Sequence, residues 1–125
     1  MKQIINSPHA PKAVGPYSQA VKANGTLYIS GQLPLNPETG KIVEGAVKEQ
    51  AIQCLHNIGE ILTEADYSFT DVVKSTVLLV DMNDFAAVNE VYASFYKEPY
   101  PARVCYQVAK LPMGALVEIE TIAVK

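Results

Sequence analysis

Apolar residues recur every three or four positions between Ala46 and Ala65, and this period constrains the fold more than any other feature of the chain. The spacing places them on one side of an α-helix of roughly residues 46–65. The stripe consists of Val47, Ala51, Leu55, Ile58, Leu62 and Ala65, while Lys48, Glu49, Gln53, Asn57, Glu60 and Glu64 lie largely off it. Because such a helix has to bury its stripe, the rest of the chain must supply a second layer.

The residues before this helix have the pattern of a β-hairpin. Asn24-Gly25 separates two strand-like runs, which we place near residues 18–23 and 26–30. Asn-Gly is the strongest short hairpin signal, because both residues tolerate a positive φ. Residues 31–41 are rich in Pro and Gly and therefore predict a loop.

After the helix, strand and helix patterns alternate. Residues 71–81 are rich in β-branched side chains and predict a strand. The second half of this strand carries apolar side chains on both faces, so we expect both faces to be buried. Asp81 or Asn83 can cap a second helix of about residues 84–97. One side of that helix carries Phe85, Val88, Tyr92 and Phe95. Two further strands are predicted at about residues 103–109 and 117–124.

The predicted order is strand, strand, helix, strand, helix, strand, strand. We expect an α+β fold in which two helices cover one face of a sheet of four or five strands, within one domain spanning residues 1–125. The uncovered face is not fully polar, since it carries Leu78, Val80, Ile122 and Val124. An apolar face left open on a small domain usually marks association, so we predict a closed oligomer.

Composition narrows the function classes. The formal net charge is −3 and no Lys/Arg cluster occurs, which argues against a nucleic-acid partner. No apolar run approaches the roughly 20 residues of a membrane span, and the N-terminus lacks an apolar signal-peptide core. We therefore expect no membrane contact and a cytoplasmic location. Isolated cysteines (Cys54, Cys105) and histidines (His9, His56) predict neither a disulfide framework nor a metal site.

The stretch "PARVCYQV" places a permanent cation, Arg103, at the start of an otherwise apolar strand. Strand alternation puts Arg103, Cys105 and Gln107 on one face, and it puts Glu118 and Glu120 on one face of the last strand. If residues 103–109 pair antiparallel with 117–124, Arg103 can lie opposite either glutamate. Two interpretations stay open: a cross-strand ion pair, or a guanidinium that binds an anionic substrate beside a carboxylate that activates water.

Other candidate residues also have an ordinary structural interpretation. Tyr17, after Gly-Pro, is typical of a turn whose ring packs on the core. Ser30-Gly31 ends a strand, where glycine allows a ligand to approach the backbone but is also common turn chemistry. The default role of Phe85 and Asn89, one helical turn apart, is core packing with a polar neighbour. Cys105 is expected to be a buried small apolar residue rather than a nucleophile.

Four stretches together resemble the Rid (YjgF) family, and more narrowly its RidA branch. They are "GPYSQA", "ISGQLPLNPETG", "VVKSTVLLVDMNDFAAVNEVY" and "PARVCYQVAKLPMGALVEIETIAV". The resemblance extends from about Ala10 to Val124 and implies a fold similar to that of trimeric chorismate mutases. It also implies a homotrimer with sheets facing inward, helices outside and ligand clefts between neighbouring subunits.

The resemblance assigns roles to particular residues. Arg103 matches the arginine that grips the substrate carboxylate, and Glu118 matches the glutamate assigned to the attacking water. Tyr17 matches a tyrosine that lines the cleft. The family's positions in the cleft wall correspond to Ser30, Gly31 and Cys105. Its helix positions near the cleft correspond to Phe85 and Asn89. Glu120 is expected to give structural support.

The implied reaction is hydrolytic deamination of 2-imino acids and their enamines, such as 2-aminoacrylate/2-iminopropanoate and 2-iminobutanoate, to 2-oxo acids and ammonia. No cofactor or metal is implied, since a carboxylate anchor and one oriented water suffice through positioning. An alternative from a different class is a ligand-binding or chaperone-like trimer without physiologically relevant catalysis.

Overall fold

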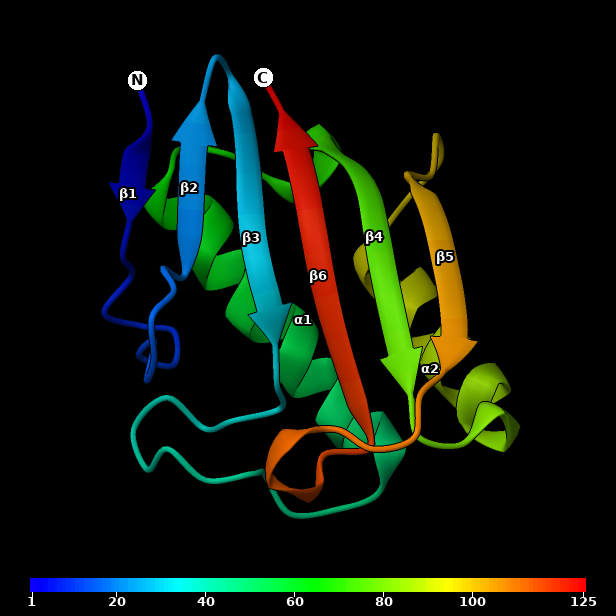
Figure 1. The fold of residues 1–125 in the computed structure, drawn as a ribbon. Coiled ribbons are helices and arrows are strands. Elements are labelled where there is room, and N and C mark those ends of the chain that lie inside the picture. Colours follow the sequence, from blue (N-terminus) through cyan, green and yellow to red (C-terminus); the bar gives the residue numbers. More distant parts are fainter.

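The computed structural model describes residues 1–125 and consists of a six-stranded sheet with two helices packed on one face (Figure 1). The strands are β1 (Gln3–Ile5), β2 (Ala20–Ala23), β3 (Thr26–Gln32), β4 (Val72–Leu79), β5 (Ala102–Gln107) and β6 (Val117–Val124). The helices are α1 (Val47–Glu64) and α2 (Phe85–Phe95), and short 3₁₀ turns lie at Phe69–Asp71, Met82–Asp84 and Pro112–Gly114. Neither helix is of a length and apolar character that would let it cross a membrane. The α+β architecture predicted from the sequence is confirmed.

Most predicted elements are present with small shifts at their ends. The Asn24-Gly25 turn has φ values of 51° and 79°, as the hairpin prediction requires. All members of the predicted α1 stripe are buried. The strand predicted at 26–30 continues to Gln32, so the predicted loop begins later than Gly31. Asp81 caps the 3₁₀ turn before α2, since its carboxylate accepts a hydrogen bond from the Asn83 backbone N–H.

Two aspects of the sheet differ from the sequence-based prediction. The short strand β1 was missed, because three residues are too few to show an alternation. The strand order is β1-β2-β3-β6-β4-β5, so β4 separates β5 from β6 and pairs with β5 in parallel. The antiparallel pairing considered between residues 103–109 and 117–124 is therefore wrong.

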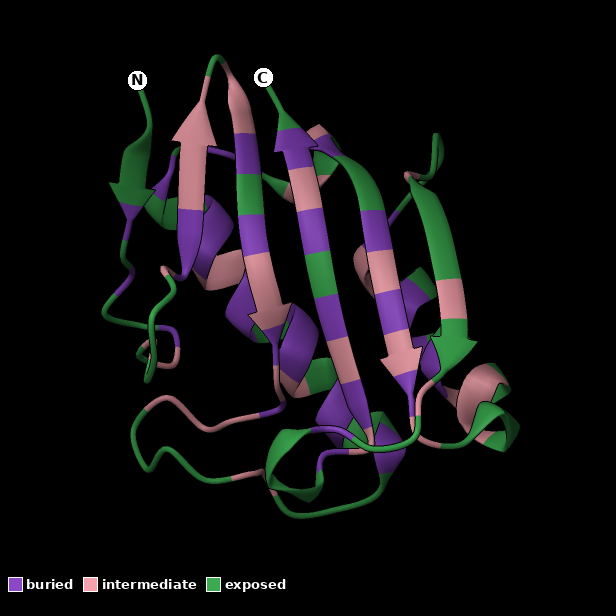
Figure 2. Cartoon of the chain, in the orientation of Figure 1, coloured by how far each residue is buried: buried purple, intermediate pink, exposed green.

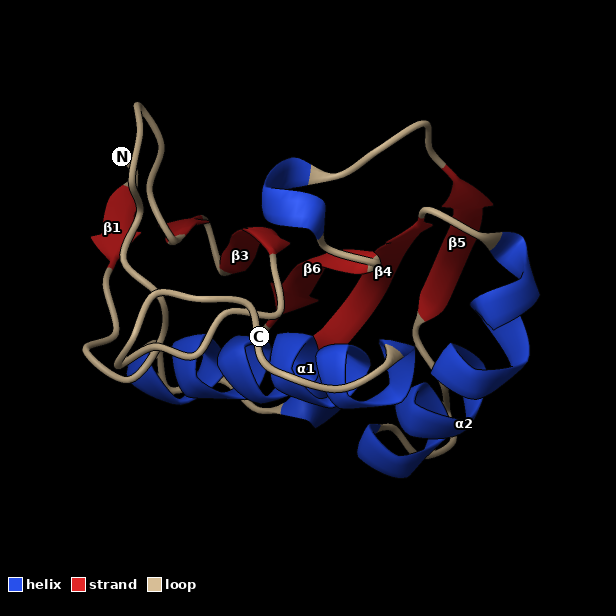
Figure 3. Ribbon diagram, turned by 90° about the horizontal axis from the view of Figure 1, so that it is seen from below, coloured by secondary structure: helices blue, strands red, loops and turns tan.

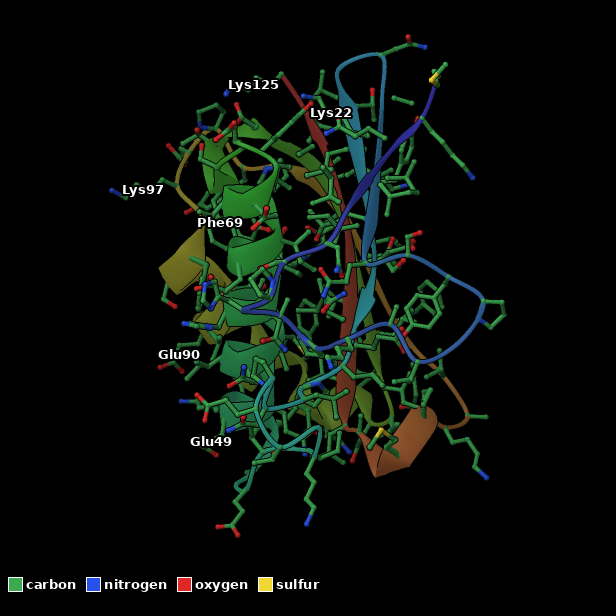
Figure 4. All side chains as sticks on the ribbon, turned by 90° about the vertical axis from the view of Figure 1, so that its left-hand side faces the viewer. Lys22, Glu49, Phe69, Glu90, Lys97 and Lys125 are labelled. Carbon is green, nitrogen blue, oxygen red and sulfur yellow. The ribbon has the colours of Figure 1, made fainter.

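β6 lies in the interior of the sheet and shows the two-residue alternation most clearly (Figure 2). The side chains of Val117, Ile119, Thr121 and Ala123 are buried, whereas Glu118 and Ile122 are half-buried and Glu120 and Val124 are exposed. Seen along the sheet, both helices lie in one layer against the buried face (Figure 3). Charged side chains such as Glu49, Glu90 and Lys97 project from the outer side of that layer (Figure 4). The core thus lies between the sheet and the helices.

The opposite face of the sheet is covered by neither α1 nor α2 (Figure 3). Its exposed large apolar residues include Ile4, Tyr28, Val104, Tyr106 and Val124. Leu78 lies between Glu118 and Tyr106 in one row across β6, β4 and β5 and is only half-buried. The prediction of an open, partly apolar sheet face is confirmed.

Three buried amide side chains fasten loops to the layered core. Gln19 accepts from the Ser7 N–H and donates to the carbonyls of Ser7, Ala10 and Pro11. On α1, Asn57 donates to the carbonyls of Leu33 and Leu35. Gln50, also on α1, accepts from the Leu116 N–H. In each loop the bonded group belongs to the main chain, so the loop's path is fixed independently of its side chains.

Asn57 was predicted to lie largely off the apolar stripe of α1, and this is wrong. Asn57 is fully buried, three residues after buried Cys54, where its amide reaches the chain after β3. Hydrophobic periodicity excludes an amide from a stripe by its polarity, although a buried amide is tolerated when its hydrogen bonds are satisfied.

We expect Asn57→Ala to lower the free energy of unfolding by about 2 kcal/mol, because two carbonyls lose their side-chain donor. Gln53→Ala is the matched control: Gln53 lies one turn away and donates to Asn57 but contacts neither carbonyl. Urea unfolding should show a much smaller effect for the control. Equal effects in both variants would contradict this role of Asn57.

Candidate functional site

Arg103 lies on the edge strand β5 and extends over α2 on the helix side of the sheet. Its Nη1 donates a 2.8 Å hydrogen bond to Oδ1 of Asn89. Its Cζ lies 5.5 Å from the ring centre of Phe85 and 4.8 Å from that of Tyr92. A hollow of about 440 Å³ opens here, lined by Asn89, Tyr92, Ala93, Tyr100, Pro101 and Arg103. No acidic side chain lines this hollow, so it suits a small anion.

Cys105 follows Arg103 on the same face of β5 and packs against the apolar core. Burial raises the pKa of its thiol, and the nearby Arg103 charge only partly offsets this rise. The thiol is therefore protonated near neutral pH, and a protonated thiol is a poor nucleophile. Cys105 lines neither the hollow at Arg103 nor the one at Glu118, so its role as a wall residue stays a prediction.

Glu118, near the start of β6, belongs to a second hollow, of about 460 Å³. The lining residues are Val14, Tyr17, Ser30, Gly31, Leu33, Leu35, Pro112, Met113 and Glu118. Glu118 is the only charged member, and most of the others are apolar. The hollow therefore presents one carboxylate in an apolar surround.

A β-bulge places Ser30 and Gly31 beside Glu118. The register between β3 and β6 shifts between Ile29 and Gln32, and bulges of this kind redirect backbone near functional sites. The Ser30 hydroxyl donates to the Ser18 carbonyl at 2.6 Å. A Cβ atom at position 31 would collide with Oε2 of Glu118. Glycine at this position is what lets the carboxylate lie against the backbone.

The environment of Glu118 raises the pKa of its carboxyl group. The main cause is burial, which disfavours the charged form, and repulsion by Glu120 adds to it. A carboxylate with a raised pKa is a stronger base than an ordinary one. This is the property needed by a group that accepts a proton from water.

The predicted site residues thus form two groups on opposite faces of the sheet. Phe85, Asn89, Arg103 and Cys105 lie on the helix side at β5, whereas Tyr17, Ser30, Gly31 and Glu118 line the hollow on the open face. Arg103 is opposite Ser75 on β4, and Glu118 is opposite Leu78. The cross-strand ion pair considered for Arg103 is therefore wrong within one chain, where the one ion pair joins Lys48 and Glu90.

Sequence reasoning missed or misjudged several residues near the two groups. The turn pattern predicted the Tyr17 ring on the core, whereas the resemblance placed it in the cleft; the ring is half exposed and lines the Glu118 hollow. Tyr92 was predicted only as part of one side of the second helix, and its contact with Arg103 was missed. Val14, Leu33 and Met113 carry no motif by which a sequence pattern could have found them; only the fold brings them together.

The largest hollow, of about 690 Å³, lies elsewhere and contains none of the predicted site residues. It is lined by Pro8, His9, Asn36, Pro37, Glu38, Ile52, Gln53, His56 and Glu60. Although both histidines occur here, no group of three or more His, Cys, Asp and Glu side chains is arranged to hold a metal ion. Size alone therefore does not make it the chemical centre.

Comparison with known proteins gives a consistent result. A family model described as Endoribonuclease L-PSP matches residues 7–125. The 2-iminobutanoate/2-iminopropanoate deaminase of goat (Capra hircus) is 56% identical over 125 residues, covering 100% of this chain and 91% of that protein. The crystal structure of RidA from an Antarctic Psychrobacter shares 52% identity with a TM-score of 0.95, over 98% of this chain and 99% of the other.

A third similarity is to Escherichia coli TdcF, crystallised with bound serine. It is 44% identical with a TM-score of 0.93, and the match covers 98% of each chain. The fold and these matches define a small α+β protein of the Endoribonuclease L-PSP class. The chain belongs to this family, and specifically to the Rid/RidA proteins that the sequence motifs indicated.

The raised pKa of Glu118 predicts a pH-dependent effect of Glu118→Gln on stability. Below the unfolded-state pKa the carboxyl is protonated in both the folded and the unfolded state, so it does not lower the free energy of unfolding. As the pH rises through the higher folded-state pKa, ionisation of the half-buried carboxyl destabilises the folded protein. At pH 7 the variant should therefore have a higher melting temperature than the parent, and its free energy of unfolding should be larger by less than about 1 kcal/mol, since the group is half exposed. The difference should vanish near pH 4.

The matched control is Glu120→Gln, which removes the same charge two residues along the strand from an exposed side chain. A Glu118→Gln protein less stable than the parent at pH 7 would contradict the burial argument.

Proposed function

We propose that this protein hydrolyses reactive 2-imino acids and their enamines, including 2-aminoacrylate/2-iminopropanoate and 2-iminobutanoate, to 2-oxo acids and ammonia. The observation that carries the proposal is the full-length similarity to proteins named as deaminases of these two imines. Two residues add support: Arg103, which has no carboxylate partner in this chain, and Glu118, whose carboxyl pKa is raised. The bound serine of TdcF is a three-carbon 2-amino acid, of the same carbon skeleton as 2-aminoacrylate.

Arg103 is assigned to the substrate carboxylate. Asn89 accepts a single hydrogen bond from its guanidinium, and no carboxylate of this chain pairs with it. A guanidinium can donate two parallel hydrogen bonds to a carboxylate, which fixes both the position and the plane of the ligand. Phe85 and Cys105 supply apolar walls beside this anchor.

Glu118 is assigned to the attacking water. It accepts a proton from water as the water oxygen bonds to C2 of the protonated imine, which gives a neutral tetrahedral carbinolamine. The Glu118 proton is then delivered to the amino group. Glu118 takes up the proton of the C2 hydroxyl as the C–N bond breaks, so that ammonia leaves and the C2 carbonyl forms. Because such imines also hydrolyse unaided, orientation of the water and the anchored substrate suffices for acceleration.

The two groups can act on one substrate only if copies of the chain associate. Arg103 and Glu118 lie on opposite faces of the sheet, and the open face carries exposed apolar residues that association would bury. We therefore propose a homotrimer with inward-facing sheets, in which Arg103 of one copy meets Glu118 of the next. Each cleft then takes its anchor and its base from different subunits.

A ligand-binding or chaperone-like trimer is the competing proposal. The presence of both Arg103 and Glu118 favours catalysis, since binding alone needs no raised-pKa carboxylate. The description of the matching family also names RNA cleavage. If re-purification removes an RNase activity but leaves the deaminase activity, the RNase belongs to a contaminant. The cytoplasmic location and a single domain over residues 1–125 stay predictions.

A dehydratase-coupled assay with a trapping amine tests the reaction. The protein should speed loss of 2-iminobutanoate beyond the spontaneous rate. Arg103→Ala should raise KM roughly tenfold or more, because charge-assisted hydrogen bonds to the carboxylate are lost. Glu118→Gln should lower kcat about 100-fold. Glu120→Gln, the matched charge control, should behave like the parent; a parent rate no faster than the spontaneous one would refute the reaction.

Subunit mixing tests the shared cleft. Arg103→Ala and Glu118→Gln chains, each at a tenth of parent activity or less when the substrate is well below KM, should reach about a quarter of parent activity when refolded together, since one cleft in four then combines two intact residues in a random cyclic trimer. Mixing of already folded trimers gives the baseline. If mass spectrometry shows mixed trimers but activity does not return, the two residues do not share a cleft across subunits.

A further inference from the structure

Tyr92 supports the guanidinium of Arg103 from within the core. The Arg103 Cζ lies closer to the ring of Tyr92, at 4.8 Å, than to that of Phe85, at 5.5 Å. Tyr92 is only 5% exposed, so water is kept from the ring side of this cation–π contact, while Arg103 itself is exposed. A ring in this position restricts where the guanidinium can lie and leaves its outer edge free for a ligand.

The ring of Tyr92 is itself held by neighbouring rings. It stacks on Tyr96 with centroids 4.5 Å apart and an interplanar angle of 30°. Tyr96 in turn meets Phe69 edge-on, with centroids 5.3 Å apart at 89°. The three rings form one packed series, which ends beneath Arg103.

Four buried hydroxyl groups converge at the inner end of these tyrosines. Thr121, Ser75 and Arg103 form one row across β6, β4 and β5 on the helix side, directly under α2. The hydroxyls of Ser75, Tyr92, Tyr96 and Thr121 have no hydrogen-bond partner in the protein. Burial raises the pKa of both tyrosines, and the Ser75 hydroxyl is near enough to counteract the rise in each.

Unpaired hydroxyls are costly in a protein interior, and such groups are usually satisfied by an internal water that makes about three hydrogen bonds. A cluster of four hydroxyls supplies both donors and acceptors, because each O–H can rotate to serve either role. One water among them would satisfy the cluster and restrain both tyrosine rings.

We propose that Tyr92 is a positioning residue for Arg103, and that an internal water bound by the hydroxyls of Ser75, Tyr92, Tyr96 and Thr121 fixes the Tyr92 ring. The part of this inference that concerns substrate binding rests on the proposed role of Arg103 as carboxylate anchor. The ring of Tyr92 also lines the hollow beside Arg103, but its proposed role is exerted through the guanidinium.

Steady-state kinetics on the assembled protein test the positioning role. Tyr92→Leu should raise KM about fivefold, which corresponds to the loss of one partly buried cation–π contact, and leave kcat within about twofold. Tyr92→Phe keeps the ring face and should restore a KM within about twofold of the parent. Val91→Ala, the matched control, truncates another buried side chain of α2 that belongs to neither the ring series nor the hydroxyl cluster, and it should lower the melting temperature without raising KM.

An equal rise in KM for Tyr92→Leu and Val91→Ala would overturn the proposal, because the effect would then reflect general loss of packing. Should Tyr92→Leu not fold, NMR of the parent protein decides: the Arg103 Cδ protons should be shifted upfield by the Tyr92 ring current, and unshifted protons would overturn it.

A high-resolution crystal structure tests the water. Ordered density within hydrogen-bond distance of at least three of the four hydroxyls is expected, and hydroxyls paired directly with one another would overturn this part. Both the NMR and the crystallographic results are independent of turnover. A parent protein without deaminase activity would therefore refute the proposed reaction while leaving the positioning of Arg103 open to these two measurements.

Discussion

The alternation of side chains along β6 is the constraint on which the rest of the structure depends. β6 lies between β3 and β4, so its odd-numbered residues must fill the space under α1 while its even-numbered residues face away. Glu118 cannot turn to the helix side without taking the whole strand with it, because a one-residue slip would place glutamates in the core. The position of the carboxylate is thus set by packing several residues away.

The same constraint on β4 and β5 puts Arg103 on the other face of the sheet. The parallel register that places Arg103 beside Ser75 also places Val104 and Tyr106 on the open face. Within a single chain the Arg103 guanidinium and the Glu118 carboxylate therefore cannot meet. In the proposed trimer, association completes the chemistry as well as burying apolar surface.

Local patterns were enough to predict the two helices, the Asn-Gly hairpin and the open apolar face, because each depends on residues close in sequence. Strand pairing was not predictable, since the alternation of β5 is equally compatible with either neighbour. This is why Arg103 was considered opposite Glu118. The motif resemblance proposed both residues, but their separation onto two faces and the supporting position of Tyr92 emerge only from tertiary structure.

The buried amides of Gln19, Gln50 and Asn57 have a consequence for how the protein can change over time. They hold three loops around Glu118 through main-chain groups, which every residue type except proline supplies in full. Side chains in those loops, such as Val14, Leu33 and Met113, can therefore be exchanged without releasing the loop from the core. Inherited variation can reshape the wall of the hollow while the carboxylate and its backbone setting stay in place.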